Sequence, residues 1–167
     1  MKYRYAFLFF SAAFLFQSAL AGHLAVFGVA PNLVLCTALL FAFLYDVKYA
    51  FVMGVVFGLL LDLCFSQLAG AASLSCLAAV LAVSLLKRSW ARDSFLSLFI
   101  VCIAGTGCYY LAYWLILFAA AGYYPFLSMA ALLPVLLPYH FTVMVLFYLA
   151  ERRSSARHPQ DRYIRGV

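Results

Sequence analysis

Few residues in this chain have the chemistry of an active site. Asp62 is the one acidic side chain well inside an apolar stretch, where a carboxylate is costly to insert into a membrane. One interpretation is a partly hydrated carboxylate that ends one helix or caps the next. The other is a specific polar contact with a neighbouring helix or a partner. A proton relay is disfavoured, because the sequence places no second acid or base beside Asp62.

Two further groups of side chains could line a site. An aromatic cluster with four-residue spacings shares one face of an expected helix, and it consists of Tyr109, Tyr110, Tyr113 and Trp114. Such a cluster is typical of a membrane interface, and a lined pocket is the alternative. His140 follows two prolines in a later apolar stretch. It is more typical of a hydrogen-bonded core histidine at a helix distortion than of a catalytic base.

The remaining reactive residues have no catalytic or metal-binding spacing. Five cysteines lie inside apolar stretches without a Cys-x-x-Cys pair, and they are Cys36, Cys64, Cys76, Cys102 and Cys108. We interpret them as small buried hydrophobes. The sequence has no paired carboxylates, no Ser-His-Asp set and no Gly-rich phosphate loop. It therefore predicts no catalytic residue, no cofactor and no metal site.

The composition indicates where the elements that carry these residues lie. Of the 167 residues, 69% are apolar and 10% are charged, whereas soluble domains are about half apolar and a quarter charged. Too few polar groups remain to cover a globular surface. An ordinary cytoplasmic enzyme, a disordered tail and a nucleic-acid-binding domain are excluded, and a polytopic membrane protein is predicted.

Charged residues divide the chain into three long apolar blocks, 5–45, 49–86 and 94–150. Each is too long for one membrane helix of about 20 residues and suits two. We therefore predict an all-α membrane protein, a compact bundle of six transmembrane helices in three hairpins within residues 1–150. The predicted spans lie near 5–22, 31–46, 49–65, 71–86, 94–120 and 127–149. A basic cytoplasmic tail, disordered or lying on anionic lipid, is expected at 151–167.

The basic residues predict the orientation of these spans. All 11 Lys and Arg lie at the N-terminus, at the two joints between hairpins or in the tail. None lies in the predicted turns near 28–32, 66–70 and 122–125. The positive-inside rule then places both termini in the cytoplasm. The first 21 residues also resemble a secretory signal, but the apolar run continues beyond them, so we interpret them as part of a first span.

Two glycines share a predicted helix face with the buried carboxylate. Gly54 and Gly58 precede Asp62 at four-residue steps, as in small-xxx-small packing motifs. Because these residues lack a Cβ, another helix can approach closely. Packing within the chain is favoured over a contact between subunits, which would make the protein a homo-oligomer.

The stretch from residue 31 to residue 86 resembles a known family. Pro31–Asn32 opens an apolar span, and the polar joint Asp46–Lys48 follows it. The run Gly54–Asp62 (GVVFGLLLD) then leads to Leu68–Gly70. The pattern is similar to that of the bacterial rod shape-determining MreD family, which has a proline opening span two, a Gly-x-x-x-Gly-Leu-x-x-Asp run and a Leu-Gly pair. Here Ala69 separates Leu68 from Gly70, so the turn departs from the family pattern.

The resemblance implies a non-enzymatic scaffold of the cell-elongation complex in the bacterial cytoplasmic (inner) membrane, supporting rod shape and lateral peptidoglycan synthesis. The implied partners are an MreC-like membrane-anchored protein, an MreB-like actin filament, peptidoglycan polymerases and membrane lipid, with no nucleic acid. Pro31, Gly54, Gly58 and Asp62 carry over as structural or interaction residues. The alternative is a small-molecule-binding membrane subunit of a vitamin or nutrient transporter, with Asp62 and the aromatic cluster lining a cavity.

Overall fold

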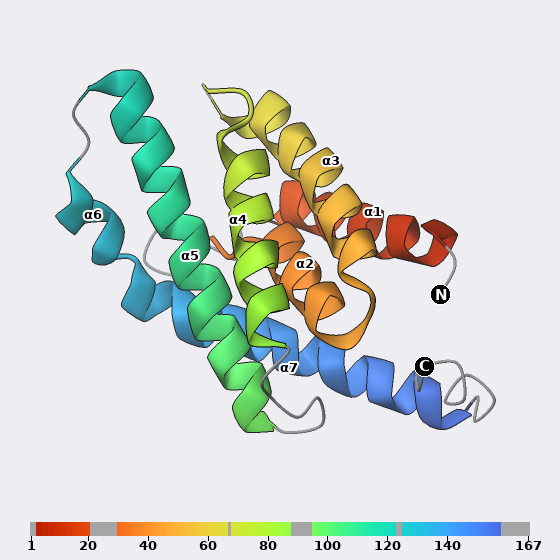
Figure 1. Ribbon diagram of the computed structural model, residues 1–167. Helices are drawn as coiled ribbons and strands as arrows, with labels where there is room; N and C mark the ends of the chain where they lie inside the picture. Colours follow the sequence, from red (N-terminus) through yellow and green to blue (C-terminus); the bar gives the residue numbers. More distant parts are fainter. Residues whose placement is uncertain (1–2, 21–29, 67, 88–94, 123–124, 158–167) are drawn as a thin grey trace.

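The computed structural model describes residues 3–20, 30–66, 68–87, 95–122 and 125–157 (Figure 1). All regular secondary structure in these residues is helical, which confirms the predicted all-α class. The helices are α1 (Tyr3–Leu20), α2 (Leu33–Leu44), α3 (Val47–Phe65), α4 (Ala71–Leu86), α5 (Phe95–Ala121), α6 (Phe126–Ala130) and α7 (Leu133–Arg157).

The first five predicted spans each coincide with one helix, but the sixth does not. The predicted span 127–149 is divided into α6 and α7 by a turn at residues 131–132. Pro134, which has no N–H to donate, lies in the first turn of α7, where that loss is tolerated. The apolar part of this stretch ends at Ala150, close to the predicted end of the span at residue 149, and α7 itself continues into the basic segment as far as Arg157.

Several of the predicted turns, joints and tail residues lie outside the residues that the structure describes. They include Gly28 and Val29 of the first predicted turn, Tyr123 and Tyr124 of the third, residues 88–94 of the second joint and residues 158–167 of the tail.

Three helical stretches in the described residues are long and apolar enough to cross a membrane. They are Val47–Phe65, Phe95–Ala120 and Phe126–Ala150. The apolar helices α2 and α4 are shorter, with 12 and 16 residues. Length and composition thus support the membrane class predicted from the sequence.

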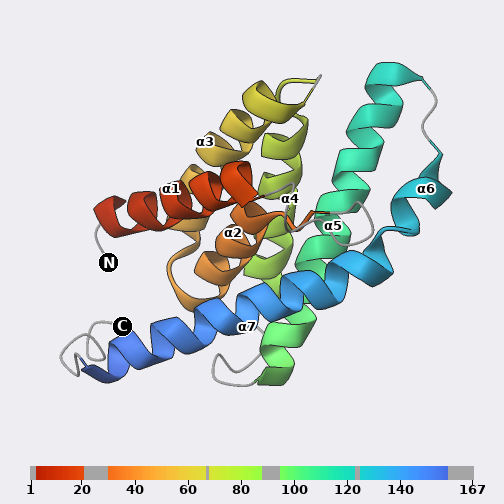
Figure 2. The ribbon, with the colours of Figure 1, turned by 180° about the vertical axis from the view of Figure 1, so that it is seen from behind.

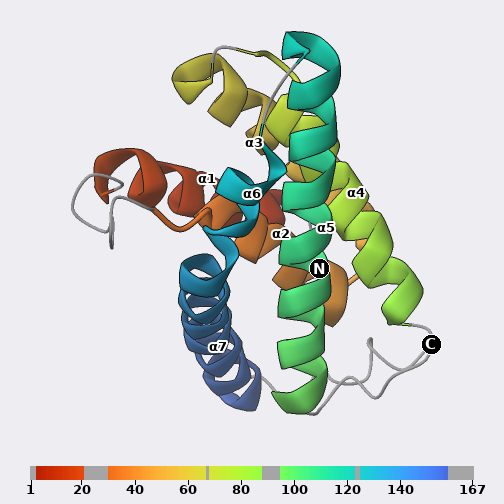
Figure 3. The ribbon, with the colours of Figure 1, turned by 90° about the vertical axis from the view of Figure 1, so that its left-hand side faces the viewer.

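The helices form two layers around α2. Helices α3, α4 and α5 run side by side with alternating directions (Figure 1). Helices α1 and α7 lie behind this layer and run obliquely across it (Figure 2). The side view shows α1 lying steeply across the direction of α5 (Figure 3). The arrangement differs from a simple ring of hairpins, because one helix occupies the centre.

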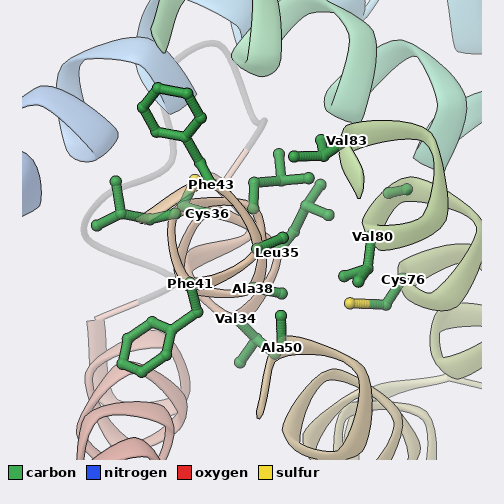
Figure 4. Close-up of a cluster of buried hydrophobic side chains, with 14 of the residues drawn as sticks. Val34, Leu35, Cys36, Ala38, Phe41, Phe43, Ala50, Cys76, Val80 and Val83 are labelled. Atoms are coloured by element: carbon green, nitrogen blue, oxygen red, sulfur yellow. The ribbon is translucent and has the colours of Figure 1, made fainter. Parts of the chain in front are cut away.

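The central helix α2 is buried on all sides. Its residues from Leu33 to Phe43 are all buried, and it contacts α1, α3, α4, α5 and α7. Viewed nearly end-on, its side chains radiate in every direction, with Phe41 pointing toward α1 and Leu35 toward α4 (Figure 4). The sequence LVLCTALLFAFL is compatible with this position, because a helix without a polar face can be enclosed by other helices on every side.

Burying α2 also buries its ends, where peptide groups have no partner within the helix. At the C-terminal end, the ammonium group of Lys87 donates to the carbonyl oxygens of Ala42 and Tyr45. Lys87 immediately follows α4, so this cap also ties the ends of α2 and α4 together. The N-terminal end begins at Asn32, whose side chain accepts from the Leu35 N–H at 2.9 Å.

Helix α5 approaches α2 closely at a glycine. A Cβ added at Gly105 would lie 2.7 Å from Cδ1 of Leu39, and Leu39 is fully buried. Neither helix can withdraw without opening the core, so this crossing requires a residue without a side chain. Two residues further along α5, on its opposite side, Gly107 has no atom within 4 Å of an added Cβ.

We expect Gly105→Ala to lower the free energy of unfolding by about 1–3 kcal/mol, because the added methyl group overpacks the contact with Leu39. Gly107→Ala is the matched control and should be neutral or slightly stabilising, since alanine favours helix by up to about 1 kcal/mol over glycine. Reversible unfolding in mixed detergent micelles, followed by circular dichroism, measures both. Equal effects of the two substitutions would contradict the close α2–α5 contact.

Candidate functional site

The three α3 residues singled out by the sequence lie on the face that packs against α4. Gly54, Gly58 and Asp62 are all buried. A Cβ added at Gly58 would lie 2.8 Å from the Cα of Ser73, and one at Gly54 would lie 3.0 Å from Sγ of Cys76. The contact at Gly58 is with backbone, which cannot move aside as a side chain can. The small-residue face is therefore used for packing within the chain.

The carboxylate of Asp62 caps the start of α4. Its Oδ2 accepts from the N–H groups of Gly70 at 3.0 Å, Ala72 at 2.9 Å and Ser73 at 3.2 Å. Its Oδ1 also accepts from Ala72 at 3.0 Å. The N-cap residue Gly70 has φ +97° and supplies no side-chain cap of its own. Asp62 takes this role from the preceding helix, and its negative charge suits the positive end of the α4 dipole.

This geometry combines parts of the two interpretations of Asp62. The carboxylate caps α4, as the first interpretation predicted, and the cap is a specific polar contact with a neighbouring helix, as the second predicted. A partly hydrated carboxylate is not found, because Asp62 is only 2% exposed. The same contact is strengthened by Ser73, whose hydroxyl donates to the Val55 carbonyl at 3.1 Å. Side chains from both helices thus bind backbone groups of the other.

A second group of polar side chains surrounds the start of α2. We call it the α2 cap cluster, and it consists of Gln17, Asn32, Thr106, Tyr109 and His140. The Asn32 N–H donates to Nε2 of His140 at 3.0 Å, and its side-chain amide donates to the Tyr109 hydroxyl at 3.2 Å. The Val34 N–H donates to Oε1 of Gln17 at 3.2 Å. Helices α1, α5 and α7 each contribute to holding this end of α2.

The hydrogen bonds define the tautomer of His140. A backbone N–H can only donate, so Nε2 is the unprotonated, accepting nitrogen. The neutral ring then carries its proton on Nδ1, 3.1 Å from the Thr106 hydroxyl, to which it donates. Tyr110 stacks over the ring at a centroid distance of 6.5 Å. His140 is therefore a hydrogen-bonded core histidine, the interpretation that its position after two prolines favoured.

The aromatic cluster of α5 is divided between two environments. Tyr109 is buried, and its ring stacks on Tyr113 at 6.0 Å. The ring centroid of Trp114 lies 5.5 Å from that of Phe118 and 5.1 Å from that of Phe126 in α6. One end of the cluster thus belongs to the core and the other to the α5–α6 contact. The four rings do not enclose a single pocket.

Residues of both groups, among them Asn32, Tyr109, Gly58 and Ala72, line one narrow crevice. The crevice has no room even for a water-sized molecule, whereas small-molecule sites commonly enclose about 300–1,000 Å³. The arrangement can fix four helices relative to one another, but this crevice is too small for a vitamin-sized ligand.

Pro31 was predicted from the sequence as a site residue but lies outside these two groups of contacts. Pro31 is buried and directly precedes Asn32, but it takes no part in the hydrogen bonds described above. Conversely, several residues that make these contacts were not predicted. The role of Asn32 could have been predicted, since an asparagine just before an apolar run is a typical N-cap. No local pattern predicts the roles of Gln17, Thr106 and Lys87, because their partners come from distant parts of the chain.

The buried polar side chains of the described residues are hydrogen-bonded within the chain. No buried side-chain nitrogen or oxygen among them lacks a hydrogen-bond partner, and they contain no group of three metal-ligating side chains. All five cysteines are free thiols. Comparison with protein-family models, curated proteins and solved structures gives no match. Functional inference therefore rests on the residues and their contacts.

We expect Asp62→Ala to lower the free energy of unfolding by about 2–3 kcal/mol, because it leaves three N–H groups of α4 without an acceptor. Asp62→Asn keeps one acceptor oxygen and should cost about 1 kcal/mol. Asp46→Ala is the matched control, since Asp46 caps α3 through Lys48 N–H at an exposed position. Micelle unfolding measures all three. A cost for Asp62→Ala no greater than for Asp46→Ala would contradict the buried cap.

Proposed function

We propose that this chain is a multi-pass protein of the bacterial cytoplasmic (inner) membrane and a non-enzymatic scaffold of the cell-elongation complex. The observation that carries the proposal is the use of the MreD-like run Gly54–Asp62. Its two glycines and its aspartate fix α4 against α3. The run thus serves architecture, as expected for a protein that works by presenting helix faces.

The exposed surface supports a membrane location. Large apolar side chains face outward along every long helix, including Leu8 of α1, Leu63 of α3 at 66% exposure and Leu85 of α4 at 68%. Contiguous apolar surface on this scale is typical of contact with lipid or with other proteins. In a membrane, such faces are matched by acyl chains without cost.

The use of the polar groups supports a scaffold role. Asp62, His140 and the half-buried Lys87 bind the chain's own helix ends, and the buried Thr37, Ser73 and Ser75 bind its backbone carbonyls. The surfaces left for partners are apolar helix faces and short connections. An MreC-like anchor helix, peptidoglycan polymerases and an MreB-like filament are the proposed partners, each reached through such a face or through the cytoplasmic joints and tail.

The one-sided distribution of the 11 Lys and Arg supports six membrane segments with both termini in the cytoplasm. A reporter that functions only in the cytoplasm should be active when it is fused after Val167. An outside-only reporter at the same position should be inactive. The opposite result would mean an odd number of crossings and would contradict the six-segment topology.

The scaffold proposal is tested by depleting the protein in its own rod-shaped host. We expect the cells to widen and round, and a tagged copy to recover an MreC-like protein in mild detergent. A copy carrying Gly107→Ala should restore shape, whereas Gly58→Leu should not, because its side chain would be driven into the backbone of α4. Normal cell shape together with lost uptake of a small nutrient would instead identify a transporter subunit.

A further inference from the structure

The outward apolar surface of α3 and α4 is short. On α3 it extends from Phe51 to Phe65, which corresponds to about 21 Å along the helix. On α4 it extends from Leu74 to Leu85, about 17 Å. The α3 surface is bounded by the exposed Lys48 at the start of the helix and by Ser66 after its end, and Lys87 follows the end of α4.

The outward apolar surface of α5 is much longer. It runs from Phe95 to Phe118, about 35 Å. The register of the two helices is given by the Cys108 thiol, which contacts the Ala78 carbonyl at 3.6 Å. Counting from that contact, α5 extends past α4 by about 8 Å at one end and about 9 Å at the other. The same overhang is visible in Figure 1.

These lengths can be compared with the hydrocarbon core of a bilayer, which is about 30 Å thick. The surface of α5 matches this thickness with a modest tilt. The surfaces of α3 and α4 fall short of it by about 9 Å and 13 Å. Tilting cannot correct the difference, because it shortens the span of a helix further. A short apolar surface is accommodated by local thinning of the bilayer or by association with other proteins.

Helices α1 and α7 lie obliquely across the α3–α4–α5 layer (Figure 2). If the helices of this layer run along the membrane normal, the apolar lengths of α1 and α7 cover less of the membrane thickness than their residue counts would allow.

We propose that the outward α3–α4 face fits a locally thinned bilayer, an inference that rests on the proposed membrane location. The partner of this face is then phospholipid with short acyl chains. The α5 face fits a bilayer of ordinary thickness. The protein thus creates a step in membrane thickness across its own width. In thick bilayers, contacts between copies would hide the short face.

The test uses the full chain in phosphatidylcholine vesicles whose acyl chains have fourteen, eighteen or twenty-two carbons. Donor and acceptor fluorescent proteins are fused after Val167, and energy transfer between copies is measured at a fixed ratio of lipid to protein. We expect energy transfer to be lowest in the thinnest bilayer and to rise about twofold or more in the thickest.

Paired substitutions test whether the α3 surface is responsible. Leu63→Ser with Phe65→Ser removes the exposed end of the α3 surface, which then ends near Leu60. The rise in energy transfer should begin at shorter acyl chains. Val56→Ser with Leu59→Ser is the matched control, because it changes two exposed residues in the middle of the same surface. The control should follow the unsubstituted protein.

The outcomes separate this inference from the function on which it rests. Failure of the protein to float with vesicles of any chain length would overturn the membrane proposal itself. Flotation with equal energy transfer at all chain lengths would overturn the thickness inference and leave the membrane location intact. High transfer at every length would also overturn it and would identify a specific contact between copies. An equal shift by the control pair would overturn it too, because the polarity of the α3 surface and not its length would then be the cause.

Discussion

Burying helix ends without leaving their peptide groups unpaired is the constraint on which this structure depends. The first N–H groups and last carbonyls of a helix have no partner within it, and a buried orphan costs about 1–3 kcal/mol. Asp62 meets this requirement for α4, while His140 and Gln17 meet it for α2. Lys87 does so at the other end of α2. The helices are placed where these side chains can reach those ends.

The glycines and the carboxylate of α3 act as one unit under this constraint. Four-residue steps place Gly54, Gly58 and Asp62 on one face. The absence of a side chain at Gly58 lets the backbone of α4 approach at Ser73, which brings the N–H groups of Ala72 and Ser73 within reach of Asp62. A larger residue at position 58 would separate the helices and lengthen these hydrogen bonds. Packing and capping are therefore coupled, which gives a physical reason for their spacing in the sequence.

The sequence predicts those features whose cause is local and misses those whose cause is tertiary. Apolar blocks, turn residues and the position of Asp62 predict most helices and the cap at α4. They do not predict that α2 is central, because a helix that is apolar on all sides shows no preferred face. The roles of Gln17 and Thr106 depend on helices distant in the chain. The break between α6 and α7 had a local signal in Pro134, which is tolerated only in the first turn of a helix.

The internal use of polar groups determines how such a protein can recognise others. Because His140 and Asp62 are engaged with its own backbone, a partner meets mainly apolar side chains. Contact between apolar helices in lipid gains little from the hydrophobic effect, since acyl chains are as apolar as leucine. Discrimination must then come from shape and length: how closely a face can be approached, and how far it extends across the bilayer. The apolar surfaces of α4 and α5 differ in length, so, given the proposed membrane location, bilayer thickness is a means by which the protein can select its surroundings.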